Sequence, residues 1–356
     1  MAHETRRRGQ KPASPLAARR ATLKDVARVA GVSPMTVSNV VNETRRGYND
    51  ETRDKVLRAV SQIGYRPDTA ARSLRTSRHM SVGMLVVAGG SRFLSDPYIT
   101  NLLGGLCQGL NQAGYSLVLQ GLQQDELAIA SLIQQRQTDG LCILMSGDFD
   151  ASPATRAMVE QARQPVILFQ QTGEYRDQDI CVLRQDDFDG GRALCAHVLD
   201  RGAKSLVAIV PQLDWPAMKA RLAGMRHEAK AAGSRARLTV ITSTDETPMA
   251  TEAALDTFLR EGGRCDAVLA GNDQMAIACY RLLQRRGLSV PADVMLTGFN
   301  GFDFLDYFST RLTSVRSPAH ELGALGAHHM VRRIEAGRFD ASSVVLPVAL
   351  LNGATT

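Results

Sequence analysis

Apolar residues near the N-terminus recur three and four positions apart, which is the spacing of a helix with one buried face. The first segment, residues 23–30, places four apolar side chains on one face: Leu23, Val26, Ala27 and Ala30. Thr22 precedes this segment at a position where a threonine hydroxyl can cap the first turn. The pattern therefore predicts a short amphipathic helix.

A second helix is expected after a single tight turn. Gly31 permits the left-handed backbone of that turn, Ser33 can cap the new helix, and Pro34 suits its first position because no N–H is needed there. The buried stripe is predicted to be Val37, Val40 and Val41. The outward side chains are predicted to be Met35, Thr36, Ser38, Asn39 and Asn42. This helix is more polar than one that only closes a core.

A third helix is expected from Asp50 to Ile63, ending at Gly64, with an inward stripe of Val56, Leu57, Val60 and Ile63. Two helices joined by a short glycine turn, the second of them polar, are typical of the helix-turn-helix. In that motif the polar face of the second helix reads base edges in the major groove. A plain helical hairpin without a DNA-binding role is the alternative reading of the pattern.

From residue 81 the pattern changes to short apolar runs that alternate with helical segments. The predicted strands are VGMLVV, SLVLQ, GLCILM, PVILFQ, SLVAIV, LTVIT, AVLAG and VMLTGF, and helices are expected over 99–113 and 125–137. Strands that alternate with helices predict parallel sheets with right-handed crossovers. So many units predict two lobes, with a ligand cleft at the carboxyl ends of the strands. The chain is expected to leave the first lobe near 183 and to return near 313–318.

Charge is distributed unevenly along the 356 residues. Residues 1–80 carry 17 Lys and Arg against 7 Asp and Glu, a net charge of +10, whereas the whole chain has a net charge of only +6. A basic head on a mildly acidic body indicates a polyanion-binding domain joined to a second domain. Residues 1–20 lack periodicity and predict a disordered basic tail.

Other classes of protein are disfavoured by what the sequence lacks. No apolar run of about 18 residues predicts a membrane span, and the N-terminus lacks the apolar segment of a secretory signal. No Walker loop, GxGxxG, GxSxG or HExxH motif indicates an enzyme, a metal or a cofactor. The six cysteines have no CxxC spacing and are predicted to be buried free thiols in a reducing compartment.

Several longer stretches resemble the lactose-repressor (LacI/GalR) family of transcription regulators. They are TLKDVARVAGVSPMTVSNVVN, ETRDKVLRAVSQIGYRP, AARSLRTSRHMSVGMLV, GNDQMAIA, RGLSVPADVMLTGFN and RLTSVRSPAHELG, in the family's order and spacing. The resemblance covers residues 21 to 350. It implies a helix-turn-helix head, a hinge that becomes helical on DNA, and a body similar to periplasmic sugar-binding proteins.

The resemblance also implies where DNA binds. Leu74 matches the residue that wedges into the minor groove, with Ala71 and Arg72 beside it, and such a wedge bends the duplex. The other DNA contacts implied are Thr22, Leu23, Ser33, Pro34, Met35, Thr36, Ser38, Asn39, Asn42, Asn49, Thr52 and Tyr65. The alternative for Leu74 is a linker residue that only packs.

The effector cleft implied by the resemblance departs from the family pattern. The candidate residues are Tyr98, Gln171, Gln185, Asp189, Trp215, Asn272 and Asn300. Trp215 stands where many members have an arginine, Asn300 replaces a common aspartate, and Gln170 and Gln171 replace a common Asp-Arg-like pair. These changes predict a neutral, amide-rich cleft with two aromatic side chains, suited to a polyhydroxylated or aromatic small molecule.

Together these features predict an α/β protein with an all-α helix-turn-helix head and a two-lobed body of parallel sheets. The expected division is a tail over 1–20, a head over 21–66, a hinge over 67–79 and an effector-binding, dimerising body over 80–356. The expected function is a cytoplasmic bacterial repressor, nucleoid-associated when bound, that binds a palindromic operator as a homodimer under control of a sugar or sugar derivative. The alternative within the same family is an activator or dual regulator with a non-sugar effector. Two other classes of protein are disfavoured. An extracytoplasmic sugar receptor would need a secretory signal and no basic head, and an enzyme would need a set of acid, base or nucleophilic residues that the sequence does not show. A dimer is expected because the sequence ends without the leucine heptad of tetrameric members.

Overall fold

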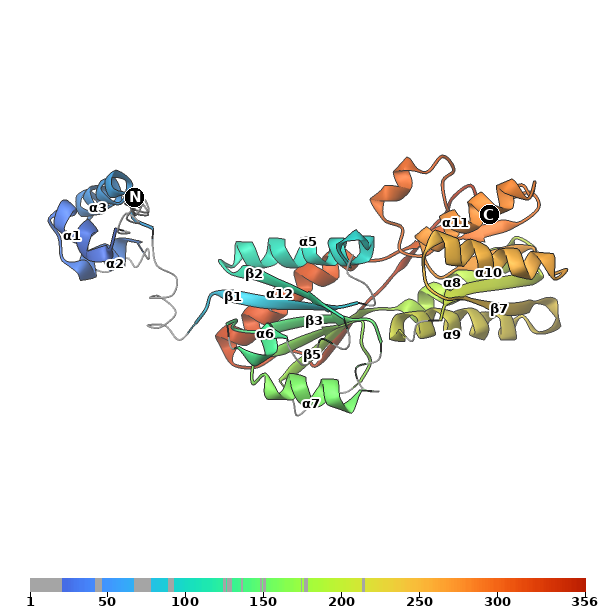
Figure 1. Cartoon of the computed structure of the whole chain (residues 1–356), viewed down its shortest axis with the longest axis horizontal. Helices are drawn as coiled ribbons and strands as arrows, with labels where there is room; N and C mark the ends of the chain where they lie inside the picture. Colours follow the sequence, from blue (N-terminus) through green and yellow to red (C-terminus); the bar gives the residue numbers. More distant parts are fainter. Residues whose placement is uncertain are drawn as a thin grey trace, which may run out of the picture. The chain divides into compact units, whose positions relative to one another are not determined.

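The computed structural model describes residues 21–41, 47–66, 78–88, 93–123, 126, 130–135, 137–147, 149, 152–173, 175, 179–212 and 215–356. The chain forms two compact units, a head (Met1–Arg78) and a body (His79–Thr356). Figure 1 shows the head in blue and the body from cyan to red. The predicted hinge residues Ala71, Arg72 and Leu74, and the predicted DNA contact Asn42, lie outside the described residues.

The head contains the three predicted helices, α1 (Leu23–Ala30), α2 (Pro34–Val41) and α3 (Asp50–Ile63). One valine from each helix, Val26, Val37 and Val56, is fully buried at the centre of a small core. Gly31 ends α1 with a φ of 67°, which is the left-handed conformation that its position in the turn requires. The helix boundaries predicted for this unit are confirmed.

Two side chains of the head lie on a different face from the one predicted. Ser38 is only 7% exposed, so its predicted outward orientation is wrong. At 100° per residue it lies about 60° from Val41, at the margin of the buried stripe, where a small side chain fits. Leu57 is 41% exposed, and Ala59 occupies the inward position instead. Positions 56, 59, 60 and 63 form the i, i+3, i+4, i+7 stripe of α3.

Lobe 1 of the body is a three-layer α/β/α unit. Its six-stranded sheet has the order β11-β5-β4-β3-β1-β2, and every pairing is parallel. The strands are β1 (Ser81–Val87), β2 (Ser116–Leu122), β3 (Leu141–Met145), β4 (Val166–Phe169), β5 (Ile180–Gln185) and β11 (Ser343–Leu346). Helices α5 (Pro97–Gln112) and α12 (Ala319–Ala336) cover one face, and α6 (Ser131–Gln134) and α7 (Pro153–Gln161) cover the other (Figure 1). A short 3-10 helix, η1 (Phe93–Ser95), precedes α5.

Lobe 2 repeats this layering around a parallel four-stranded sheet of order β7-β6-β8-β9. The strands are β6 (Ser205–Pro211), β7 (Arg237–Ser243), β8 (Ala267–Ala270) and β9 (Met295–Thr297). Helices α8 (Asp187–Asp200) and α9 (Pro216–Ala231) pack on one face, and α10 (Pro248–Arg260) and α11 (Asp273–Arg285) on the other. The lobe also contains the 3-10 helices η3 (Gly233–Arg235) and η4 (Asp303–Tyr307).

The chain passes between the lobes three times. It leaves lobe 1 after β5, returns between β10 (Ser314–Arg316) and α12, and crosses once more between β11 and β12 (Ala349–Leu351). Strand β12 pairs antiparallel with β10 on the lobe 2 side. The first two crossings are confirmed close to the predicted positions, whereas the third was not predicted.

Other predictions for the body are corrected in detail. The helix predicted over 125–137 is confined to the four residues of α6 within the described part of that segment. Strands β5, β10, β11 and β12 were missing from the predicted series. All six cysteines are free and five are buried, as predicted, but Cys107 is only half-buried.

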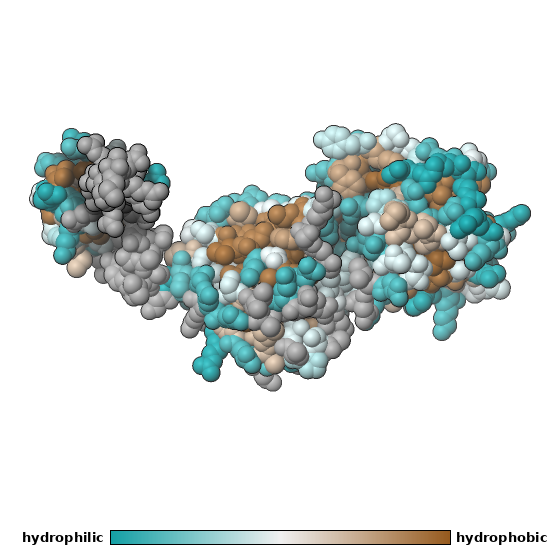
Figure 2. Space-filling view, in the orientation of Figure 1, coloured by the Kyte–Doolittle hydropathy of each residue, from teal (hydrophilic) through white to brown (hydrophobic). Residues whose placement is uncertain are grey.

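One surface of lobe 1 is conspicuously apolar. Figure 2 shows hydrophobic residues gathered over the face formed by α5 and β2. Leu94, Val118 and Leu119 are 51%, 38% and 38% exposed. Strand β2 is an edge strand of the sheet, so its outer hydrogen-bonding groups are open to pairing or covering. Within the described residues, no helix is long and apolar enough to cross a membrane.

Candidate DNA interface and effector cleft

The helices of the head are capped by side chains that were predicted to contact DNA. Thr22 and Asp25 form a capping box at α1, in which the Thr22 N–H donates to Asp25 Oδ2 over 2.9 Å. The Thr36 N–H donates to Ser33 Oγ over 3.1 Å at α2, and the Thr52 N–H donates to Asn49 Oδ1 over 2.9 Å at α3. These caps fix the start of each helix and satisfy its first donors.

The first turns of α2 present the side chains that remain available at the surface. Met35 is 69% exposed, and Thr36 and Asn39 are partly exposed. Leu23 and Tyr65 are partly exposed and pack against the head core, whereas Ser38 is buried and therefore not accessible. Pro34 is exposed at the start of the same helix. The face around Met35, Thr36 and Asn39 is therefore the surface of α2 that can meet base edges.

The body contains a cavity between the lobes, with a volume of about 730 Å³ including its open mouth. Lobe 1 lines it with the ends of β1 and β3, the start of α5, and Gln170 just after β4. Lobe 2 lines it with residues that follow its strands: Trp215, Glu246, Asn272 and Asn300. The predicted position of the cleft, at the carboxyl ends of both sheets, is confirmed.

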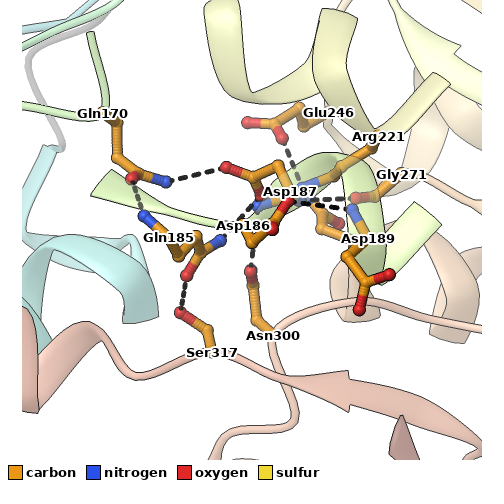
Figure 3. Close-up of polar contacts among 11 residues, drawn as sticks. Gln170, Gln185, Asp186, Asp187, Asp189, Arg221, Glu246, Gly271, Asn300 and Ser317 are labelled. Atoms are coloured by element: carbon orange, nitrogen blue, oxygen red, sulfur yellow. Dashed lines mark hydrogen bonds and ion pairs between the residues drawn. The ribbon is translucent and has the colours of Figure 1, made fainter. Parts of the chain in front are cut away.

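Arg221 on α9 is the central polar residue of the cavity. Its Nε donates to Asp187 Oδ1 over 2.8 Å, its Nη1 to the Gly271 carbonyl over 2.7 Å, and its Nη2 to Asn300 Oδ1 over 3.4 Å. The guanidinium carbon lies 3.7 Å from the centre of the Phe299 ring. Figure 3 shows Asp187, Gly271 and Asn300 around the Arg221 side chain.

Close packing of two helices brings Arg221 and Asp187 together. A Cβ at Gly191 of α8 would lie 2.0 Å from the backbone oxygen of Arg221, so only glycine permits this approach of α8 to α9. Asp187 begins α8 and points at the same place. The Asp187 and Arg221 side chains are 4% and 6% exposed.

Amide side chains from lobe 1 complete the surroundings of Asp187. Gln185 Nε2 donates to Asp187 Oδ1 over 2.8 Å, and Gln170 Nε2 donates to Oδ2 over 3.2 Å. Ser317 Oγ donates to Gln185 Oε1 over 2.5 Å, which links the first and second crossings between the lobes. Asp187 therefore joins lobe 1 amides to the lobe 2 arginine (Figure 3).

The other carboxyl groups near the cavity have altered pKa values. Burial, the neighbouring Asp96 charge and Asp245 raise the pKa of Glu246 to about 8, against an opposing effect of Arg221 and Asn272. Burial also raises the pKa of Asp96. Beneath the cavity, burial raises the pKa of Asp273 to about 7, although Ser314 and backbone N–H groups stabilise its ionised form.

The loop that carries Asn300 is held in an uncommon backbone conformation. Asn300 has a φ of 113°, which is rare for a residue with a side chain. The Gly301 N–H donates to Asp273 Oδ2 over 2.6 Å, and the Asn300 N–H donates to the Val315 carbonyl over 2.8 Å. These bonds fix the direction in which the Asn300 side chain meets Arg221.

Four of the seven predicted effector residues line the cavity: Tyr98, Trp215, Asn272 and Asn300. Three do not. The Gln171 side chain holds the Met145, Gly147 and Phe149 backbone, Gln185 lies behind the cavity against Asp187, and Asp189 pairs with Arg192 over 2.7 Å at the surface. Figure 3 shows the Asp189 carboxylate pointing away from the network.

The chemistry of the cleft differs from the prediction. The cleft contains an arginine, Arg221, in addition to Trp215. The cleft is also not neutral, because Asp96, Glu246 and the Arg221–Asp187 ion pair surround it. The predictions for the cleft did not include Asp96, which caps α5, or Arg221, which lies within α9.

A helix-turn-helix head joined to a two-lobed body with an interlobe cavity defines the class of ligand-binding DNA regulators. Residues 22–68 match the family described as bacterial regulatory proteins, lacI family, and residues 195–356 match a periplasmic binding protein-like domain. The chain is therefore similar to the LacI family of transcription regulators in its head and to periplasmic binding proteins in its body, which agrees with the resemblance seen in the sequence.

Relatives match over nearly the whole chain. The ribose operon repressor of Escherichia coli strain K12 is 29% identical over 317 residues, covering 88% of this chain and 93% of the relative. The HTH-type transcriptional repressor PurR of Erwinia tasmaniensis is 28% identical over 327 residues, covering 91% and 93%. These relatives are bacterial transcription repressors rather than enzymes.

Solved structures have the same fold. A complex of the transcriptional regulator CelR with cellobiose has a TM-score of 0.71 and 26% identity, covering 95% of this chain and 100% of that one. The Lac repressor dimer bound to operator and the anti-inducer ONPF has a TM-score of 0.82 and 24% identity, covering 95% and 99%. The predicted fold class is confirmed.

Proposed function

We propose that the protein is a repressor that binds a palindromic operator as a homodimer, and that a sugar or sugar derivative in the interlobe cavity controls its operator affinity. The observation that carries this proposal is the cavity itself, which both lobes line and which belongs to the same chain as a helix-turn-helix. A ligand that contacts both lobes favours one arrangement of them over others, and so can shift an equilibrium between two states.

The head supplies the DNA-binding part of the proposal. Its net positive charge suits the phosphate backbone, and Met35, Thr36 and Asn39 lie on the available face of α2. We propose that residues 21–66 form the DNA-binding unit, that residues 67–79 form a hinge, and that residues 80–356 form the effector-binding and dimerising unit. Action of this kind would take place in the bacterial cytoplasm, with the protein on the nucleoid when bound.

The apolar face of lobe 1 supports the dimer. A palindrome is read with two-fold symmetry, which requires a self-complementary surface on each copy. Leu94, Val118 and Leu119 provide exposed apolar area on α5's side of the sheet and on edge strand β2. Patches of this kind on soluble proteins mark interaction sites.

The proposal is tested by selecting duplexes that the full-length protein binds and measuring operator affinity by fluorescence anisotropy with and without ligands. Trp215 is the only tryptophan and lines the cavity, so its fluorescence reports occupancy directly. A ligand that quenches or shifts Trp215 emission should change operator affinity. If the ligand lowers operator affinity, it is an inducer of a repressor. If the ligand raises operator affinity, it is a co-repressor, or the protein is an activator with a different effector.

Matched variants separate the cavity from the remainder of the body. Tyr98→Ala should abolish the ligand response while leaving operator affinity without ligand within about twofold, because Tyr98 is remote in sequence from the head and lines the cavity. Phe188→Ala removes a 40% exposed ring outside the cavity and should change neither. Operator binding that no cavity ligand alters would contradict the effector part, and binding without sequence preference would contradict the regulator part.

A further inference from the structure

The charges around the cavity are unbalanced. Asp96 and Glu246 line it with two carboxyl groups and Asp187 adds a third just behind the lining, whereas Arg221 is the one cationic side chain among the described residues that line it. Arg221 is also already engaged, because each of its three nitrogens donates a hydrogen bond and Asp187 neutralises its charge. An anionic ligand would therefore find no free cation and would face the remaining carboxyl groups.

Glu246 and Asp96 approach the cavity from opposite lobes. Glu246 follows β7 in lobe 2, and Asp96 caps α5 in lobe 1 by accepting from the Tyr98 N–H over 2.8 Å. Glu246 Oε1 accepts from Asn272 Nδ2 over 2.5 Å, and its second oxygen has no hydrogen-bond partner among the described residues. The two carboxyl groups are close enough for Asp96 to disfavour ionisation of Glu246.

Two further polar atoms at this cavity lack partners. Tyr98 Oη and Trp215 Nε1 are buried, and neither makes a hydrogen bond within the described structure. Both side chains line the cavity, one from each lobe. Buried donors without partners are costly, and a hydroxyl-bearing ligand would supply partners for both. The faces of these two aromatic rings also suit a cation.

We propose that the cavity takes a polyhydroxylated amine, such as an amino sugar or aminocyclitol, whose ammonium group lies between Glu246 and Asp96 while its hydroxyl groups bond to Tyr98 and Trp215. This inference deepens the proposed function, because it rests on the cavity being the effector site. The ammonium would stabilise the ionised forms of two carboxyl groups that belong to different lobes, and would thereby favour their approach.

Proton release distinguishes an amine from a neutral ligand. With a pKa of about 8, Glu246 is mostly protonated at pH 6.5. The groups that face it are Asp96, Arg221, Asp245 and Asn272, of which the two aspartates raise the pKa and the other two lower it. An ammonium placed against Glu246 lowers its pKa, so binding should release up to one proton per ligand. A neutral sugar would leave the proton in place.

The experiment uses the full-length protein and three sugars: glucose, galactose and mannose. Each sugar forms a set of three probes, namely the neutral sugar, its 2-amino-2-deoxy analogue and its 6-phosphate. Trp215 fluorescence and titration calorimetry at pH 6.5 give affinities, and two buffers of different ionisation enthalpy give the number of protons released. The amino member of at least one set should bind about 10-fold tighter than its neutral counterpart, the factor expected for a hydrogen bond to a charged group. The phosphates should bind weakest.

Glu246→Gln keeps the shape of the side chain and removes its charge. This variant should lose most of the preference for the amine and all of the proton release, while any binding of the neutral sugar persists. Glu252→Gln is the control, because Glu252 on α10 pairs with Arg285 of α11 and does not line the cavity. Circular dichroism shows whether each variant is folded.

Each outcome decides the inference. Neutral or phosphorylated probes that bind as well as the amines would overturn the amine subsite but leave an effector-binding cavity. Failure of every amine to bind would also overturn the amine subsite. The proposed DNA-binding function is tested separately, because the same protein preparation should still select an operator from random duplexes. An amine preference that Glu246→Gln leaves intact would place the ammonium elsewhere and would equally contradict the proposal.

Discussion

Arg221 Nε lies 2.8 Å from Asp187 Oδ1, and both side chains are almost fully buried, with 6% and 4% exposed. Removing one partner of a buried ion pair leaves the other charge without compensation. We expect Arg221→Met and Asp187→Asn each to lower the free energy of unfolding of the body by ~3–5 kcal/mol, the range typical of such pairs. The measurement is urea unfolding followed by Trp215 fluorescence, which reports lobe 2.

The double variant, Arg221→Met with Asp187→Asn, provides the control. If the two residues act as a pair, its destabilisation should be clearly smaller than the sum of the single effects. Simple additivity would show that the two residues stabilise the body separately and that the ion pair contributes little.

The second prediction concerns the pH dependence of stability. Glu246 has a pKa raised from 4.5 to about 8 and Asp273 from 3.8 to about 7. The folded state therefore holds these protons at pH values where the unfolded state has lost them, so their contribution to stability is full below pH 4 and is lost as the pH rises to 8. Burial lowers the pKa of His197 and His329, whose contributions change in the opposite direction.

Variants separate the contribution of the carboxyl groups to the pH dependence of stability from that of the histidines. Urea midpoints at pH 5, 6.5 and 8 should fall less steeply with pH in Glu246→Gln and Asp273→Asn than in the parent protein, whereas Glu252→Gln should follow the parent. Parallel profiles for all four proteins would mean that neither buried carboxyl group has a raised pKa.

The third prediction concerns base recognition. Asn39 lies on the partly exposed face of α2, where the resemblance to the family indicates that arginine or histidine is common. Asparagine matches adenine N6 and N7, whereas arginine matches guanine O6 and N7. Asn39→Arg should therefore change the preferred pair from A·T to G·C at one position of each half-site in a selection from random duplexes. Changing Arg45, which lies outside the described residues, should weaken all sequences about equally, as a phosphate contact does.

An unchanged preference at every position in the Asn39→Arg protein would remove Asn39 from base readout. Met35, which is 69% exposed, and Thr36 would then be the remaining candidates on α2.

The fourth prediction concerns Leu74 in the expected hinge, also outside the described residues. Leu74→Ala should lower operator affinity by about 10-fold or more, within the range of one lost specific contact, and should reduce DNA bending. Unfolding of the body should be unaltered. Equal affinity and equal bending in the variant complex would show that Leu74 serves only as linker packing.

The fifth prediction concerns association. Light scattering at micromolar concentration should show a dimer, and Val118→Lys with Leu119→Lys should produce a monomer by placing charge on both sides of edge strand β2. Val345→Lys is the control, because Val345 is 39% exposed on the opposite edge strand, β11, of the same sheet. A stable tetramer of the parent protein, or a dimer that survives the double change, would contradict this assignment.

The elements of the fold could be predicted because apolar periodicity is a local signal. The helices of the head and the eight predicted strands follow directly from it. Whether Leu57 or Ala59 of α3 faces inward depends on how three helices pack, and is not local. The cleft shows the same limit: Asp187, not Asp189, faces Arg221 because Gly191 lets α8 approach α9, and residues two positions apart on a helix point in very different directions.

The three connections between the lobes lie close together. Gln185 at the first is paired in register with Leu346 at the third, and it is hydrogen bonded to Ser317 at the second. Three adjacent backbone segments resist sliding and twisting, because either motion would stretch at least one of them, but all can bend in the same direction. The motion that these connections allow most easily is therefore opening and closing of the two lobes. If one connection were cut, the other two would still restrict the lobes to this motion.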